Sequence, residues 1–113
     1  MAGPQNLRGA ERVVAMVKVG LFARLQAKPG KEAEVAQLLK GALDLAQRER
    51  ETAVWYAVQF GPATFGIFDA FEGESGREAH LKGAIAAALM AKAPDLLAEA
   101  PRIEKVDILA AKT

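Results

Sequence analysis

The stretch FGIFDAFEGESGREAH, residues 65–80, has the pattern of a strand, a sharp corner and the first turn of a helix. Large apolar residues occupy both parities of residues 64–71, which is typical of a central strand packed on both faces. Glu72-Gly73-Glu74 interrupts this pattern, and Ser75 then stands three residues before Glu78. That spacing predicts a capping box, in which the serine and glutamate side chains bond free amides of the first helical turn.

Two titratable side chains flank this corner. Asp69 lies within the strand, and His80, the only histidine of the chain, follows just inside the helix. A buried carboxylate needs a partner, because ionisation without one is costly or shifts the pKa. We therefore expect Asp69 to contact a nearby arginine, lysine or backbone amide, and we expect a pocket close to His80.

The composition is that of one globular domain. The chain has 113 residues, of which 51% are hydrophobic and 26% are charged, so a core of ordinary size and a charged surface can both form. The net charge is +1 and no basic block occurs, which argues against nucleic-acid binding. The absence of cysteine excludes disulfides, thiolate metal sites and a cysteine nucleophile. No apolar run resembles a signal peptide or a membrane span, so we expect a cytoplasmic protein that does not enter membranes.

Hydrophobic periodicity predicts four strands and two main helices. The expected strands are residues 13–25, 53–60, 64–71 and 102–110. The expected helices are residues 31–48 and 75–90, with a short extra helix at 95–98 that begins after Pro94. Residues 1–12 are polar and predict a flexible tail, which leaves residues 13–113 as a single domain.

The order of these elements is β-α-β-β-α-β, the split βαβ pattern of ferredoxin-like folds. Right-handed crossovers then predict an α+β fold, a four-stranded antiparallel sheet with both helices on one face. The strands at 13–25 and 64–71 carry apolar residues on both faces, yet the helices cover only one of them. A second copy of the sheet would cover the other face, so we expect a homodimer.

Counting reactive residues excludes several kinds of active site. Ser75 is the only serine and is expected to cap a helix, which argues against a serine hydrolase. One histidine and no cysteine leave no conventional zinc or iron site, although magnesium held by carboxylates alone stays open. The glycines of residues 61–66, GPATFG, fit a hairpin, and no phosphate-binding loop or dinucleotide fingerprint occurs.

The surroundings of His80 leave two interpretations open. Helical spacing predicts a shared stripe of Arg77, His80, Ala84, Ala87 and Ala91. The small side chains of this stripe either allow tight packing, with the histidine at the helix edge, or leave a small apolar cavity with an imidazole in its wall. Trp55 is likewise either a core aromatic or a ligand contact.

A resemblance to a known family bears on this choice. The segments VGLFARLQAKPGKEAEV (residues 19–35) and TFGIFDAFEGESGREAHL (residues 64–81), together with the element order, resemble the antibiotic biosynthesis monooxygenase superfamily, including its quinol monooxygenase-like proteins. The resemblance covers residues 14–112. It implies a ferredoxin-like dimer that closes a shared α/β barrel, with a ligand cavity between sheet and helices in each subunit.

The resemblance also implies an activity. Characterised enzymes of that superfamily oxidise phenols or quinols with dioxygen and use no metal, flavin or other cofactor. The protein then needs only to remove a proton, hold the substrate and exclude water. His80 matches the helix histidine of the family and is expected to accept the proton or bind the substrate, and Asp69 stands where many members have glutamate. The expected substrate contacts are Phe22, Arg24, Trp55, Phe68, Arg77 and Ala84.

One departure from the family limits the transfer. Asn6 is the only asparagine, so sites of the polyketide-oxidising or haem-degrading type, which use asparagine with tryptophan, are not reproduced. The main expectation is a cofactor-independent monooxygenase acting on a small quinol or phenol. The alternative is a non-catalytic dimeric module of the same fold that binds a small apolar ligand or acts in stress.

The state of His80 separates these two expectations. Burial lowers the pKa of an imidazole and an anionic partner such as Asp69 raises it, so we expect a pKa near neutrality, suited to a general base. A strongly shifted pKa beside a closed pocket would favour the enzyme, whereas a solid core would favour the binding module.

Overall fold

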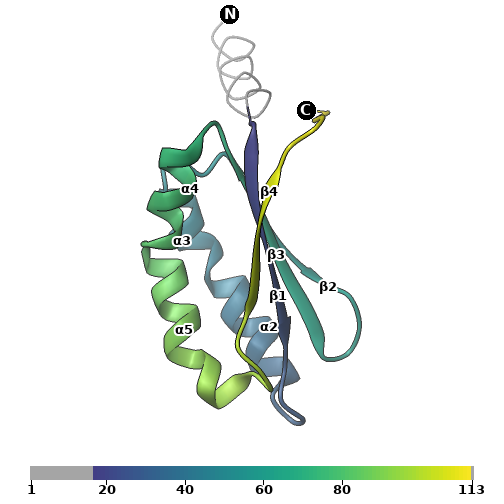
Figure 1. The fold of residues 1–113 in the computed structure, drawn as a ribbon. Coiled ribbons are helices and arrows are strands. Elements are labelled where there is room, and N and C mark those ends of the chain that lie inside the picture. Colours follow the sequence, from purple (N-terminus) through teal and green to yellow (C-terminus); the bar gives the residue numbers. More distant parts are fainter. Residues whose placement is uncertain (1–16, 113) are drawn as a thin grey trace, which may run out of the picture.

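The computed structural model describes residues 17–112. One layer is a four-stranded antiparallel sheet, and the other consists of helical segments that lie along it (Figure 1). The elements are β1 (Val19–Gln26), α2 (Glu32–Gly41), α3 (Leu43–Arg48), β2 (Val54–Gln59), β3 (Thr64–Phe71), α4 (Glu74–Leu81), α5 (Ala84–Leu96) and β4 (Arg102–Asp107).

The strand order is β2-β3-β1-β4, and each neighbouring pair is antiparallel. The predicted ferredoxin-like fold is therefore confirmed. β1 and β3 are the central strands, as their apolar residues on both faces predicted, and β3 has the predicted bounds. The predicted tail and residues 13–16 of the first predicted strand lie outside the described residues.

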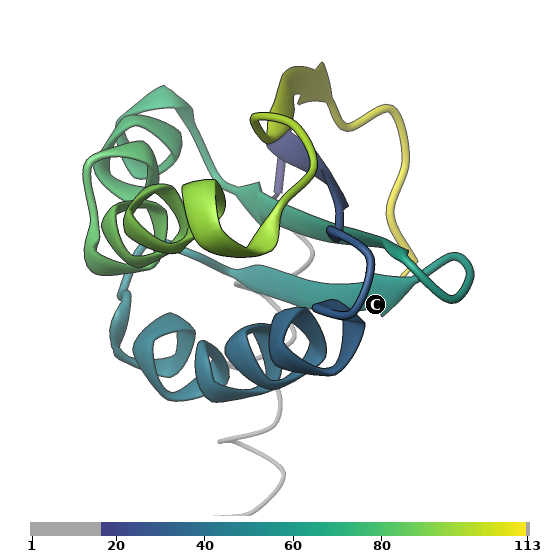
Figure 2. The same ribbon diagram turned by 90° about the horizontal axis from the view of Figure 1, so that it is seen from below.

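The structure divides each predicted helix in two. α2 and α3 fill the span of the first, separated by Ala42, which keeps helical dihedrals (φ −70°, ψ −15°). α4 and α5 replace the second, which is divided at the extended Gly83 (φ −88°, ψ −176°) and runs past the predicted end at residue 90 to Leu96. The apolar stripe of the sequence continues across this break, which is why periodicity predicts one helix. Viewed along the sheet, all these helices cover the same face (Figure 2).

Two local predictions are wrong. α4 begins at Glu74, one residue earlier than expected, so Ser75 falls inside the first turn and its hydroxyl donates to Glu51 at 3.0 Å instead of capping the helix. Pro94 does not begin a separate helix but lies inside α5, close to its C-terminal end. There its carbonyl accepts a hydrogen bond from Lys28 Nζ at 2.6 Å, which links the end of α5 to the turn after β1.

The two faces of the sheet differ in what covers them. The core lies between sheet and helices, where Leu25, Val35 and Phe71 are its largest fully buried side chains. On the other face, Tyr56 and Phe60 are 60% and 52% exposed. Each helix in the described part of the chain is too short or too polar to cross a lipid bilayer.

Candidate functional site

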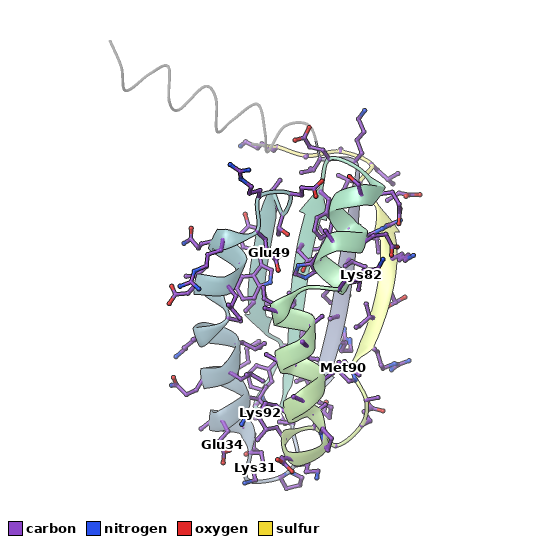
Figure 3. The ribbon with its side chains drawn as sticks, turned by 90° about the vertical axis from the view of Figure 1, so that its left-hand side faces the viewer. Lys31, Glu34, Glu49, Lys82, Met90 and Lys92 are labelled. Carbon is purple, nitrogen blue, oxygen red and sulfur yellow. The ribbon has the colours of Figure 1, made fainter. Side chains whose placement is uncertain are left out.

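Three ionisable side chains from separate parts of the chain meet between the helices and the sheet. His80 of α4 lies between Asp69 of β3 and Glu49, which directly follows α3. The distance from His80 Nε2 to Asp69 Oδ2 is 2.9 Å, and that from His80 Nδ1 to Glu49 Oε1 is 2.6 Å. We call these three residues the triad. Glu49 lies in the same half of the helical layer as Lys82, far from Lys31 at the opposite end (Figure 3).

Local structure fixes each member of the triad. Asp69 belongs to the helix-facing side of β3, where its register partner on β2 is Trp55. The His80 ring packs against Phe71, with 5.5 Å between ring centroids. Glu49 Oε1 also accepts a hydrogen bond from Thr52 Oγ1 at 2.7 Å. These contacts hold both carboxylates against opposite edges of one imidazole ring.

Gly83, the glycine of the α4–α5 break, makes room for Glu49. A Cβ atom at Gly83 would lie 3.1 Å from Glu49 Oε2 and 3.3 Å from the carbonyl oxygens of Ala79 and His80. The extended backbone of Gly83 therefore ends α4 just after His80 and at the same time leaves space for the carboxylate that reaches the ring.

The charges of the triad are strongly coupled. Burial alone lowers the pKa of His80, but hydrogen bonds and charge from Asp69 and Glu49 outweigh it and raise that pKa to about 9. Burial raises the pKa of Asp69 above its ordinary value; the hydrogen bond and charge of His80 oppose this, while the charge of Glu49 adds to it. Asp69 is the anionic partner that we expected to raise the pKa of His80 and to orient its ring.

The expectation of a near-neutral pKa for His80 is wrong. A second carboxylate, Glu49, supplies the extra stabilisation of the charged ring. With a pKa of about 9, His80 is an imidazolium at neutral pH, and both its N–H groups donate to carboxylates. It therefore has no free lone pair with which to accept a proton, and with both carboxylates ionised the triad carries a net charge of −1.

His80 separates two hollows of different character. On the sheet side, a cavity of about 50 Å³ is bounded by His80, Asp69 and apolar side chains of β1, β3, α4 and α5. On the outer side, an open cleft of about 520 Å³ is lined by Glu49, Thr52 and the break between α4 and α5. The cavity is large enough for one or two water molecules.

Two buried polar side-chain atoms have no hydrogen-bond partner in the described part of the chain. They are Asp69 Oδ1 and Trp55 Nε1. Asp69 and Trp55 are register partners on adjacent strands, so their side chains share the helix-facing side of the sheet. Asp69 lines the cavity whereas Trp55 does not, so Asp69 Oδ1 is the acceptor that a ligand hydroxyl in the cavity could meet.

The structure brings together only part of the predicted substrate site. Trp55 and Asp69 lie next to each other and His80 bonds Asp69. Arg77 is buried, but its guanidinium donates to the carbonyl oxygens of Gly20 and Val106 and pairs with Glu74, so it ties α4 to the sheet edge. Ala84 lines the outer cleft instead of the cavity, and Ala87 is exposed. The alanine that lines the cavity is Ala86.

The other three predicted contacts lie on the opposite face of the sheet. Phe22 and Phe68 are register partners, one position out of phase with Asp69, and they share the open face with Arg24. The Arg24 guanidinium lies over the Phe60 ring at 4.5 Å and near the Phe22 ring at 5.9 Å. Because side chains alternate between faces, these residues cannot line a pocket with His80 in the same subunit.

The triad is not arranged as a metal site. A metal ion needs ligand atoms that converge on one point, whereas the two nitrogens of His80 point at different carboxylates. No group of three or more suitable ligands is found within residues 17–112.

Comparison with known proteins places the chain in a family. No protein-family model and no curated protein sequence matches it. The crystal structure of NE2512, a protein of unknown function from Nitrosomonas europaea, is 58% identical in sequence, with a TM-score of 0.86 over 88% of this chain and 96% of that one. The chain belongs to the family of NE2512.

More distant structures identify the fold. Proteins provisionally named antibiotic biosynthesis monooxygenases, from Nitrosomonas europaea and Chloroflexus aurantiacus, match with TM-scores of 0.72 and 0.66, each at 16% identity. The matches cover 80% and 85% of this chain and 98% and 97% of theirs. The NE2512 family therefore has the fold of the antibiotic biosynthesis monooxygenase superfamily, as the sequence predicted.

Sequence reasoning missed Glu49. It lies in a run of charged residues, Arg48 to Glu51, where the pattern shows only the polar end of a helix. Two features visible in the sequence lie near Glu49 in space. They are His80, which follows Asp69 by one corner, and Gly83 shortly after that histidine. Neither signal points to position 49 without the tertiary structure.

Proposed function

We propose that the protein is a monooxygenase that oxidises a small quinol or phenol with dioxygen in the cavity beside the triad. The observation that supports this most directly is the free Asp69 Oδ1, a buried carboxylate oxygen at an otherwise apolar cavity wall. Such an oxygen suits the acidic O–H of a phenol, and its raised pKa makes it a stronger proton acceptor than an ordinary aspartate.

In this proposal Asp69, not His80, takes the substrate proton. The imidazolium of His80 stabilises the carboxylate before transfer and keeps Oδ2 engaged, which leaves Oδ1 for the substrate.

The reaction balances without an external reductant. A hydroquinone and dioxygen give a hydroxyquinone and water: one oxygen atom bonds to a ring carbon, the other leaves as water, and the quinol supplies all four electrons. The anionic quinol can pass an electron directly to dioxygen, so the site must supply deprotonation, orientation and exclusion of bulk water.

Substrate entry requires the cavity to widen. A volume of about 50 Å³ is less than an aromatic ring occupies. Met90 and Ile103, which are 55% and 44% exposed, line the cavity and border the surface. The flexible methionine side chain is the element that can move to admit a ring.

Oxygen uptake tests this function. Purified protein with a panel of hydroquinones and polyphenols should consume dioxygen, and Asp69→Asn should slow the turnover by about 100- to 10,000-fold, as expected for loss of a general base. Glu51→Gln changes a carboxylate at the outer cleft and serves as the control that keeps wild-type turnover. An Asp69→Asn variant with full turnover on a confirmed substrate would contradict the proposal.

The small volume of the cavity favours a second candidate, a dimeric module that binds a small ligand without oxidising it. The same panel separates the two. Binding that shifts the spectrum of a phenol without consuming dioxygen would support the module, whereas dioxygen consumption would support the enzyme.

A further inference from the structure

The net charge of the triad determines how readily Asp69 accepts a proton. Suppose that the buried pair were Asp69 and the His80 imidazolium alone. Its net charge would be zero, and transfer of a substrate proton to Asp69 would break this ion pair and leave the imidazolium to the substrate anion alone. Neutralising the carboxylate of such a buried ion pair is costly, because the imidazolium stabilises its charged form.

Glu49 changes this balance. Its Oε1 lies 2.6 Å from His80 Nδ1, so the imidazolium is shared between two carboxylates. The triad then begins at a net charge of −1 and reaches zero when Asp69 gains a proton. The substrate anion keeps the negative charge, so the charge of the whole site is unchanged by the transfer. Glu49 eases it because it stays paired with the imidazolium and repels the charged form of Asp69.

We propose that Glu49 is the positioning residue that makes the triad a proton acceptor for an acidic O–H ligand in the cavity. Glu49 itself does not touch that ligand, because it lies on the far side of the imidazole and faces the outer cleft. It acts through His80, by competing with Asp69 for the positive charge. This inference deepens the proposed function and rests on it for the identity of the ligand.

The surroundings of Glu49 are built to hold it in this role. Thr52 donates to the oxygen that also contacts His80, and Gly83 leaves room for the second oxygen. The other charged side chains that line the cleft are Arg48, Arg50 and Glu51. Glu51 receives a hydrogen bond from Ser75 and is exposed, so it provides a matched carboxylate in the same cleft with no bond to the ring.

The single histidine makes the test direct. In uniformly labelled wild-type protein, nuclear magnetic resonance would follow the ring nitrogens of His80 and the carboxyl carbon of Asp69 across pH. We expect Glu49→Gln to lower the midpoints of both titrations, because a neighbouring negative charge is removed from each. Glu51→Gln should leave both midpoints at their wild-type values.

A conservative variant separates the charge from the fold. Glu49→Asp keeps the charge on a shorter side chain, so both midpoints should lie between those of wild type and Glu49→Gln. If Glu49→Gln is too unstable to titrate, the comparison of wild type with Glu49→Asp decides. An Asp69 midpoint that is equal in wild type, Glu49→Asp and any folded Glu49→Gln would overturn the inference.

This readout needs no substrate, so its outcome is independent of the oxygen-uptake test. A shifted Asp69 titration without dioxygen consumption would leave the role of Glu49 in place and remove the proposed monooxygenase function. Dioxygen consumption with unshifted titrations would support the monooxygenase and overturn the role of Glu49.

Discussion

At the scale of single residues, His80 is better described as a structural charge than as a base. It is 7% exposed and bonded on both edges, so its positive charge compensates two carboxylates that come from elsewhere in the chain. Its pKa of about 9 lies well above the ordinary value of 6.5. Folding therefore binds a proton that the unfolded chain would release near neutral pH.

This shift predicts how stability depends on pH. Because the folded pKa of His80 is raised, its contribution is fully present below about pH 6.5 and is lost as pH rises through about 9. The loss amounts to at most about 3 kcal/mol, from roughly 1.4 kcal/mol per pKa unit. Thermal unfolding at pH 6 and at pH 10 measures it, and the melting temperature should fall over that interval.

The control for this prediction is His80→Gln, which keeps a polar side chain but cannot titrate. It should be less stable than wild type at pH 6, since the two carboxylates lose their counter-charge. Its melting temperature should also change less between pH 6 and pH 10. The same pH dependence in both proteins would contradict the assignment to His80.

At the scale of elements, Gly76 and Gly83 allow α4 to lie close to the segment that contains Glu49. A Cβ atom at Gly76, in α4, would lie 3.0 Å from the backbone oxygen of Glu51 and 3.1 Å from its Cβ. Gly76 is thus the point where α4 approaches the segment that carries Glu49. Gly83, at the end of α4, makes the corresponding space for the Glu49 carboxylate itself.

Substitution at Gly76 tests this close approach. Gly76→Ala should lower the free energy of unfolding by about 1–3 kcal/mol, because backbone cannot move aside as a flexible side chain can. The matched control is Gly41→Ala at the end of α2, where an added Cβ has no neighbour within 4 Å. There alanine should stabilise by up to about 1 kcal/mol through its higher helix propensity. Urea unfolding compares the two, and a stabilised Gly76→Ala would disprove the close approach.

At the scale of the whole molecule, no helix within residues 17–112 covers the open face of the sheet. Phe22 and Phe68 lie there beside the exposed Tyr56, Val58 and Phe60. An apolar surface of this kind on a helix-free sheet face marks an interaction site. We therefore keep the homodimer as a prediction, with the two sheets packed face to face and Phe22, Arg24 and Phe68 in their interface.

Light scattering coupled to gel filtration tests the dimer, and wild type should elute with twice the chain mass. Val58→Lys places a charge on the open face of β2 and should shift the protein to monomer. Gln59→Lys is the control, because the neighbouring position points to the other side of the same edge strand. A wild-type monomer at micromolar concentration would contradict the prediction.

The sequence alone determined the fold of this protein. Apolar residues on both parities mark β1 and β3 as central strands, and helical periodicity between the strands leaves one arrangement compatible with right-handed crossovers. Asp69 and His80 are also visible in the sequence, because both flank one corner and the chain has no other histidine. These features depend on contacts between near neighbours in the chain, which a local pattern records.

Only the tertiary structure decided the chemistry of the site. Glu49 lies 31 positions from His80, and its contact depends on where α3 ends and where Gly83 divides α4 from α5. The charge of His80 depends in turn on that contact, and so does our proposal that Asp69 accepts the substrate proton. Electrostatic interactions act through space between residues that are distant in sequence, so no local pattern contains them.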